Sequence, residues 1–182
     1  MSNCRFIRNG NDGVDLMESE IAIVDSEWIE NGDKGVSVGE QTRAVILNGR
    51  FVGNGIGSQV KDESQALYYN CTFERNQKSL DSYNKNWRYR RGGTVHVWKS
   101  VFRGNAEQIT SDRRSQIFVY DSYCDASIAA RRGRIELAEV DDGSQKVAKH
   151  RRVQQAELPG LARGSVFEAL LLDADPARRG AK

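Results

Sequence analysis

The clearest pattern in the chain is a repeat of one large hydrophobic residue within a fixed polar frame. This residue recurs at intervals of 22, 23, 22 and 29 positions, at Phe6, Trp28, Phe51, Phe73 and Phe102. Three positions after each comes an asparagine: Asn9, Asn31, Asn54, Asn76 and Asn105. Three positions before each comes a polar residue: Asn3, Asp25, Asn48, Asn70 and Lys99. A sixth, weaker copy consists of Asp121, Cys124 and Ser127. A fixed period of this length indicates a stacked repeat architecture.

A short hydrophobic stretch precedes the polar residue of each repeat. These stretches cover residues 21–24, 44–47, 66–69, 95–98 and 117–120. They are rich in β-branched or aromatic residues and are bounded by Gly, Asn and Ser, which is typical of strands. Because residues 1–125 hold no sustained 3.6-residue period, we do not expect helices there. A parallel β-helix fits best, with each repeat forming one coil and strands stacking at about 4.8 Å.

Stacked coils would place equivalent residues of successive repeats directly above one another. The asparagines would then form a ladder of hydrogen-bonded amides, and the large residues an aromatic stack inside the coil. Gly13, Gly35 and Gly57 would mark bends where a Cβ atom would obstruct the chain.

The repeat also resembles a known family. The patterns NCxFxxN…DGVDL, GDKGVSVGE and GSQVKDES are similar to those of right-handed parallel β-helix repeat proteins of the pectate-lyase-like superfamily, over residues 3–127. The resemblance implies an all-β, right-handed parallel β-helix solenoid of about six coils over residues 1–140. It implies no single activity, because that superfamily includes lyases, hydrolases, epimerases and non-catalytic surface or binding proteins.

Alternation along each strand predicts that its first and third hydrophobic residues point inward and the others outward. The outward set is unexpectedly apolar, and its later members form an aromatic wall of Tyr69, Trp98 and Tyr120 beside His96 and Phe118. This wall could be a platform for sugar rings. Alternatively, the tail of the chain or a neighbouring chain packs on it.

A ladder of acidic residues recurs every 22 positions, at Glu18, Glu40 and Asp62. Three interpretations remain open. The carboxylates could be solvated turn residues, ligands of a bound Ca²⁺, or catalytic groups at the separations that glycosidases use.

An insertion lengthens one coil, since the step from Phe73 to Phe102 is 29 residues instead of 22. Insertions in solenoids usually lie on a binding face. This one interleaves aromatic and basic residues: Tyr83, Lys85, Trp87, Arg88, Tyr89, Arg90 and Arg91. Such a mixture suits an anionic polysaccharide, because aromatic rings stack on sugars and arginines pair with carboxylates. It would also suit nucleic acid, or a loop folded back on the coil.

Candidate site residues follow from these features. For substrate binding they are Lys61, Tyr83, Trp87, Arg88, Tyr89 and Arg90. For catalysis they are Lys61, Lys85, Arg88, Glu40 and Asp62, which could supply the base and the cation site of a polysaccharide lyase or the acids of a glycoside hydrolase. For Ca²⁺ they are Glu18, Glu40 and Asp62. No complete catalytic signature is present, so activity stays open.

Composition restricts the function classes. The 182 residues are 38% hydrophobic and 29% charged, and no run is long enough for a transmembrane helix. The net charge of +2 is too small to indicate nucleic acid, which we do not expect as the partner. Cys4 and Cys71 share one column three coils apart, about 14 Å, which is too far for a disulfide. Cys124 falls in the Phe column, so all three are expected to be core thiols.

The ends differ from the repeats. The chain begins within a coil, so we expect N-terminal coils and other domains of a longer parent chain. A role in binding or processing polysaccharide leads us to expect an extracellular or cell-surface location. Residues 141–182 form a polar, basic tail that is disordered or partly helical, with a short helix near 165–173 capped by Ser165. The sequence therefore predicts a β-helix that binds or processes polysaccharide. The alternative is a non-catalytic structural or adhesive stalk.

Overall fold

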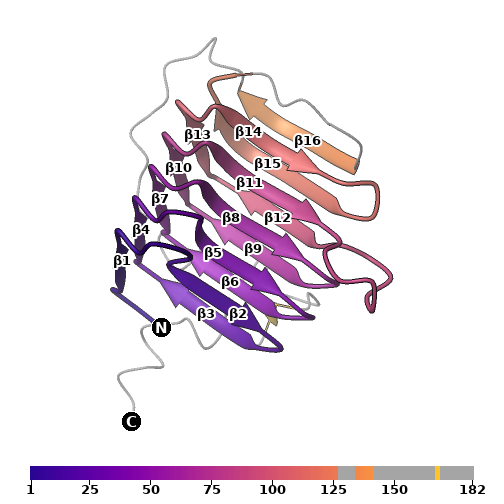
Figure 1. Cartoon of the computed structure of the whole chain (residues 1–182). Coiled ribbons are helices and arrows are strands. Elements are labelled where there is room, and N and C mark those ends of the chain that lie inside the picture. The colour runs from indigo at the N-terminus through magenta and orange to yellow at the C-terminus, as the bar shows by residue number, and fades with distance from the viewer. Residues whose placement is uncertain (127–133, 142–166, 169–182) are drawn as a thin grey trace.

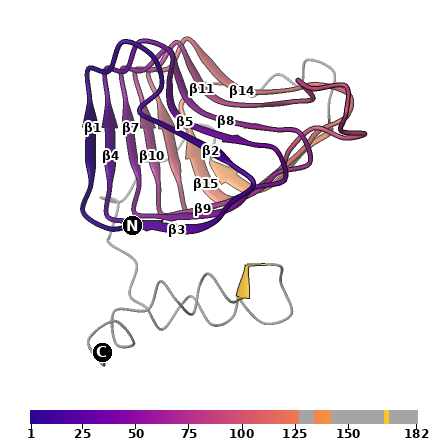
Figure 2. The ribbon, with the colours of Figure 1, turned by 60° about the horizontal axis from the view of Figure 1, so that its bottom comes forward.

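The computed structural model describes residues 1–126, 134–141 and 167–168. It is a parallel β-solenoid of about six coils, stacked as Figure 1 shows. Each coil contributes strands to three faces, which surround a common interior (Figure 2). All strand pairs between neighbouring coils are parallel, and equivalent repeat positions are in register: Phe51, for example, pairs with Trp28 and Phe73. The predicted fold class is confirmed.

The strands of the three faces have these bounds. Face A contains β3 (Glu20–Val24), β6 (Arg43–Leu47), β9 (Gln65–Tyr69), β12 (Thr94–Trp98) and β15 (Gln116–Cys124). Face B contains β1 (Arg5–Ile7), β4 (Glu27–Ile29), β7 (Arg50–Val52), β10 (Thr72–Glu74) and β13 (Val101–Arg103). Face C contains β2 (Val14–Met17), β5 (Lys34–Gly39), β8 (Ile56–Lys61), β11 (Lys78–Tyr83) and β14 (Glu107–Ser111). The final strand, β16 (Arg134–Asp141), pairs with β15.

The interior is organised by the aromatic stack that the repeat predicts. The rings of Trp28, Phe51, Phe73 and Phe102 lie nearly parallel, with successive centroids 4.6, 4.5 and 4.8 Å apart. All four side chains are fully buried. A parallel glycine column lies beside them, where a Cβ on Gly35 would come within 2.5 Å of the Gly57 carbonyl oxygen. The glycines are therefore required by close backbone approach.

The predicted asparagine ladder runs along the corner after face B. The side-chain amide of Asn9 donates to Asn31 at 2.7 Å, Asn31 to Asn54 at 2.8 Å, and Asn54 to Asn76 at 3.0 Å. Asn76 continues the ladder to Asn105 at 3.0 Å. Ser127, its expected sixth member, lies outside the described residues.

Polar residues occupy the corners because these positions adopt left-handed backbone conformations. Between faces A and B the residues with positive φ are Asn3, Asp25, Asn48, Asn70, Lys99 and Asp121. Asn and Asp tolerate this conformation better than most residues. The acidic ladder occupies the corresponding corner between faces C and A, where φ is 46° at Glu18, 54° at Glu40 and 56° at Asp62.

The cysteines lie where their columns predict. All three are free thiols; Cys71 and Cys124 are buried and Cys4 is half-buried. The backbone amide of Cys71 donates to the Ser100 hydroxyl at 3.1 Å, as expected for neighbours in one column. Burial raises the pKa of the Cys71 thiol to about 12, so it is an inert core group.

The outer side of face A carries a second apolar cluster. Val45, Leu47, Leu67 and Tyr69 point away from the interior, yet none is more than 5% exposed. Phe167 belongs to the same cluster and is itself only 5% exposed. Its position beside face A can be followed in Figure 2, where residues 167–168 are yellow. The sequence leaves open whether this wall is a sugar platform or is covered by the tail or a neighbouring chain, and the packing of Phe167 favours cover by the chain's own tail. The rest of the predicted 165–173 helix and of the 141–182 tail lies outside the described residues.

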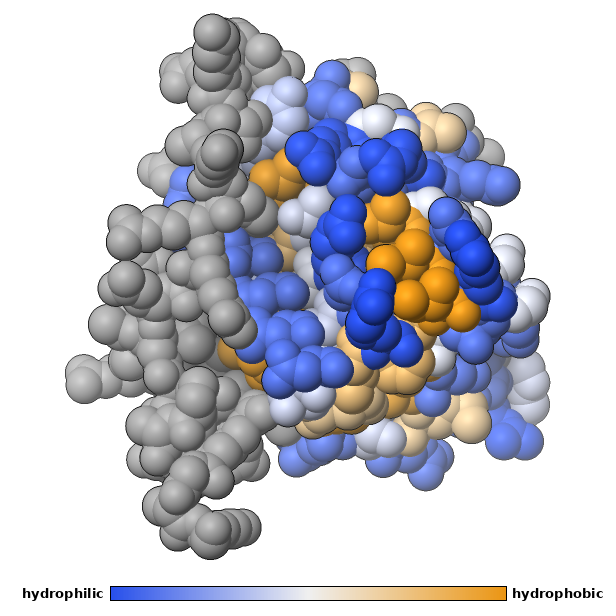
Figure 3. Space-filling model, turned by 90° about the vertical axis from the view of Figure 1, so that its left-hand side faces the viewer, coloured by the Kyte–Doolittle hydropathy of each residue, from blue (hydrophilic) through white to orange (hydrophobic). Residues whose placement is uncertain are grey.

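Face B carries a small apolar patch on its outer side. Ile7, Ile29 and Val52 occupy neighbouring positions of one column, and Ile7 is 39% exposed. Figure 3 shows apolar surface on this side of the molecule, framed by hydrophilic residues. The ion pairs Arg5–Glu27 and Arg8–Glu30, at 2.9 and 2.8 Å, lie two positions before and one position after Ile7 and Ile29 in the sequence.

Candidate functional site

The insertion forms an ordered loop, residues 84–93, between β11 and β12. It extends from the corner between faces C and A, on the opposite side of the coil from β1 and β4 (Figure 2). The Asn84 side chain shapes it from within, because its amide donates to the carbonyl oxygens of Tyr89 and Arg91 at 3.1 and 2.9 Å. The Asn84 backbone amide donates to Asp112 of the adjoining coil at 3.0 Å.

The other side of the loop is fixed by two consecutive carboxylates. Asp62 accepts hydrogen bonds from the backbone amides of Lys85 and Asn86 at 2.7 and 2.8 Å, both on the same oxygen. Glu63 accepts the backbone amide of Arg90 at 3.0 Å. These contacts hold both arms of the loop against the coil.

The tip of this fixed loop leaves its large side chains in solvent. Trp87 is 86% exposed, the highest value among the large hydrophobic residues of the described ranges. Lys85, Arg88 and Arg90 are also exposed, and their side chains make no salt bridge within the described part of the chain. The structure thus brings four predicted residues together on one surface.

A groove of about 950 Å³ runs along the corner beside this loop. Its lining combines acidic, basic and neutral polar groups: Glu18, Ser19, Glu20, Gln41, Arg43, Glu63, Gln65, Arg90, Arg91, Gly92 and Thr94. Two of its carboxylates are already engaged, because Glu20 pairs with Arg43 at 2.7 Å and Glu63 accepts from Gln41 at 3.1 Å. Hydrogen bonds from Gln41 and the Arg90 amide lower the pKa of Glu63. We call this surface the corner groove.

Tyr89 connects the loop with the acidic ladder. Partial burial and the nearby carboxylates of Glu40, Glu18 and Asp62 raise the pKa of its phenol. The ring is half-buried, so it is folded toward the corner and not presented fully to solvent. Of the aromatic residues predicted for substrate binding, Tyr83 and Tyr89 are both half-buried, and Trp87 is the exposed one.

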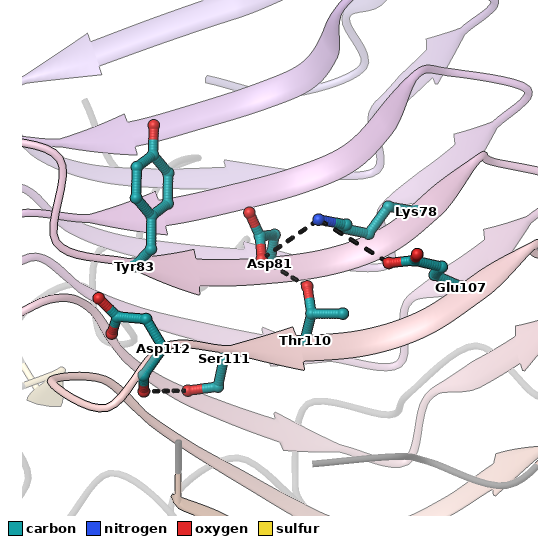
Figure 4. Close-up of a pocket in the computed structure, with 7 residues that line it drawn as sticks. All are labelled: Lys78, Asp81, Tyr83, Glu107, Thr110, Ser111 and Asp112. Atoms are coloured by element: carbon teal, nitrogen blue, oxygen red, sulfur yellow. Dashed lines mark hydrogen bonds and ion pairs between the residues drawn. The ribbon is translucent and has the colours of Figure 1, made fainter. Parts of the chain in front are cut away.

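A second groove, of about 530 Å³, lies on the outer side of face C between β11 and β14 (Figure 4). Tyr83 forms one wall, and Asp81 lies on its floor, where it accepts hydrogen bonds from Thr110 and, at 3.0 Å, from Gln59. Lys78 lies 3.6 Å from Asp81 and 3.9 Å from Glu107. Burial raises the pKa of the Tyr83 phenol.

Lys61 is buried and lines neither of these grooves. Its side chain crosses Gly39, and its ammonium group donates to the Ser37 hydroxyl at 2.8 Å. It is 7% exposed. Burial lowers the pKa of this ammonium group, while Asp15 acts in the opposite direction. The structure does not bring it together with Trp87 and the loop arginines on one accessible surface.

The acidic ladder does not form a metal centre in the part of the chain described. No three His, Cys, Asp or Glu side chains there lie close enough together to hold a metal ion. Asp62 is 1% exposed and bonded to backbone amides, whereas Glu40 is half-buried and Glu18 exposed. The three carboxylates are thus stacked in one column but differ in surroundings.

Sequence reasoning missed several residues of the corner groove, chiefly Arg43, Gln41 and Glu63. The repeat register could have found two of them, because Gln41 and Glu63 are 22 positions apart and directly follow Glu40 and Asp62. Arg43 begins β6, and no motif marks it.

Comparison with known proteins supports the fold. The sequence profile of a family described as a right-handed beta helix region matches residues 1–128. No curated protein matches the sequence.

In the described ranges, no helical segment has the length and hydrophobicity that crossing a lipid bilayer requires.

Proposed function

Because the chain belongs to the right-handed β-helix family, whose fold sets no single activity, we propose a function from its surface: it binds an anionic polysaccharide. The binding surface consists of the insertion loop and the corner groove. The observation that carries the proposal is the combination of a loop fixed by hydrogen bonds with an 86% exposed Trp87 at its tip. A fixed, exposed indole loses little conformational freedom when a flat ligand stacks on it.

The charges beside Trp87 favour an anionic ligand. Lys85, Arg88 and Arg90 lie on the same loop and are not neutralised by salt bridges within the described residues. Arginine presents a planar fork that matches a carboxylate, so uronate sugars fit this surface well. An extended polymer also fits the corner groove, whose neutral donors Gln41, Gln65 and Thr94 can bond sugar hydroxyls.

The proposal is for binding, because two catalytic candidates have structural partners. The Lys61 ammonium group is buried against Ser37, and the Asp62 carboxylate accepts two backbone amides. A general base must reach its substrate within hydrogen-bond distance, and neither group is accessible. An extracellular or cell-surface location, also proposed, would give the protein access to such polymers.

A matched pair of variants tests the proposal. The first replaces Trp87, Arg88 and Arg90 with Ala. The control replaces Arg5, Ile7 and Arg8 with Ala. These are one exposed hydrophobic residue and two exposed arginines, on the distant β1 and directly after it. Binding to an oligouronate is measured by calorimetry after a glycan array has selected the best ligand.

We expect the first variant to lose about tenfold or more in affinity, and the control to bind as the unchanged protein does. Binding should also weaken with added salt, since the attraction is electrostatic. If the loop variant binds as tightly as the control, or if no anionic glycan binds, the proposal is wrong. A structural or adhesive spacer would then be the better account.

A further inference from the structure

We propose that Asp62 and Glu63 form a clamp that positions the insertion loop for its ligand. The two residues are positioning residues, because they hold the loop that carries the exposed side chains. Asp62 is buried away from the ligand, whereas Glu63 also lines the corner groove. The inference deepens the proposed function and rests on it, because it names what sets the affinity of that surface.

The first arm of the clamp is the Asp62 carboxylate. It is 1% exposed, and one of its oxygens accepts the amides of both Lys85 and Asn86. Within the described residues no cation lies within salt-bridge distance of it. Burying a carboxylate without a cation is costly unless hydrogen bonds satisfy it, so these two amides are its compensation. The start of the loop and the Asp62 side chain therefore stabilise each other.

The second arm is Glu63, which contacts the end of the loop twice. Its side chain accepts the Arg90 amide at 3.0 Å, and its own backbone amide lies 3.1 Å from the carbonyl oxygens of Arg91 and Gly92. Gln41 of the neighbouring coil donates to the other carboxylate oxygen at 3.1 Å and orients it. The four exposed side chains of the loop thus lie between two fixed points.

The acidic ladder itself provides the comparison that assigns this role. Glu40 occupies the same corner position one coil away, with φ of 54° against 56° for Asp62. Tyr89 of the loop lies near it, but among the described residues no backbone amide of the loop bonds to its carboxylate, and it is only half-buried. The burial of Asp62 therefore follows from the loop that closes over it, and not from the corner backbone that all three acids share.

The clamp lowers the entropic cost of ligand binding by the insertion loop. A free loop of ten residues would lose conformational entropy on binding, which would lower the affinity. Holding Trp87 and Arg90 in place before the ligand arrives removes much of this cost. Loss of the clamp should therefore weaken binding while leaving every contacting side chain present.

The test compares Asp62→Ala, Asp62→Asn and Glu63→Ala with the control Glu30→Ala, an exposed glutamate with φ of 54° at another corner of the coil. Amide hydrogen exchange measures the order of the loop at Lys85, Asn86 and Arg90, and calorimetry measures the affinity for an oligouronate. We expect Asp62→Ala to speed exchange at Lys85 and Asn86 by about tenfold or more and to lower affinity by a similar factor. Exchange in the core, at Asn54, should be unchanged.

Rescue separates positioning from general stability. An asparagine carbonyl oxygen can accept the same two amides, so Asp62→Asn should recover part of both the protection and the affinity. Glu30→Ala should change neither. If Asp62→Ala does not fold, Glu63→Ala carries the test through exchange at Arg90, because Glu63 is only half-buried and its loss leaves no large cavity.

Two results overturn the inference. The first is unchanged exchange at Lys85 and Asn86 in Asp62→Ala. The second is a loop that loosens without any loss of affinity, which would leave the clamp with a structural role only. If the unchanged protein binds no oligouronate, the proposed function fails. The exchange rates at Lys85 and Asn86 still test, independently of any ligand, whether Asp62 orders the loop.

Discussion

The buried amide of Asn54 illustrates how single residues secure each coil. Its oxygen accepts the backbone amide of Asn31 at 3.0 Å, and its nitrogen donates to the Trp28 carbonyl oxygen at 3.0 Å. Because every coil repeats this arrangement, one residue satisfies backbone groups of its neighbours that the corner would otherwise leave unpaired.

Replacing Asn54 with Ala should lower the free energy of unfolding by about 3 kcal/mol, since the partners stay buried without hydrogen bonds. Urea unfolding measures the effect. Asn9→Ala, at the exposed end of the ladder, is the control and should cost less than about 1 kcal/mol. Equal losses in the two variants would contradict the role of burial.

Ser79 shows the opposite situation. It is fully buried on β11, and its hydroxyl has no hydrogen-bond partner among the described residues. Ser79→Ala should therefore raise the free energy of unfolding by about 1 kcal/mol. Ser82 on the same strand donates to the Val60 carbonyl oxygen at 3.0 Å, so Ser82→Ala should lower stability in the same urea experiment. A loss of stability in both would show that the Ser79 hydroxyl has a partner.

At the scale of elements, sequence reasoning was most accurate where residues repeat. The strands of face A and their inward residues were predictable because four hydrophobic positions recur before a polar corner. Face C was harder, because its outward positions hold Gly39, Gln59 and Lys61, which are not typical of strands. The partners of Asp62 were unpredictable, since they belong to an insertion whose path no repeat specifies.

The outer side of face A makes stability depend on pH. The His96 ring stacks on the Phe118 ring with centroids 4.9 Å apart, and the edge of the Phe167 ring faces it with centroids 6.2 Å apart. Burial lowers the pKa of His96 below the usual 6.5. In acid the unfolded chain then takes up a proton at His96 before the folded protein does. Stability should fall as the pH drops below about 6.5.

Thermal melts at about pH 7.5 and about pH 5.5 measure this effect. His96→Leu, which matches Leu67 in the same column, should show a smaller drop in Tm between the two pH values than the unchanged protein. The carboxylates titrate in both proteins and cancel in the comparison. Identical drops would contradict the assignment to His96.

At the scale of the whole molecule, regular columns build the solenoid and departures from them mark its specific features. The stack from Trp28 to Phe102 and the asparagine ladder repeat through every complete coil, so both could be read from the sequence. Phe167 could not, because a single aromatic residue outside the repeats gives no indication of where it packs. The insertion was recognisable as an irregularity, but only the structure distinguishes exposed Trp87 from half-buried Tyr89.

The most direct test of the account follows the indole N–H signals of the three tryptophans by NMR while an oligouronate is added. We predict that the Trp87 signal shifts and saturates, that the signal of fully buried Trp28 stays in place, and that about 0.5 M salt reverses the change. A Trp87 signal that does not move, or equal shifts at Trp87 and Trp28, would contradict binding at the insertion loop.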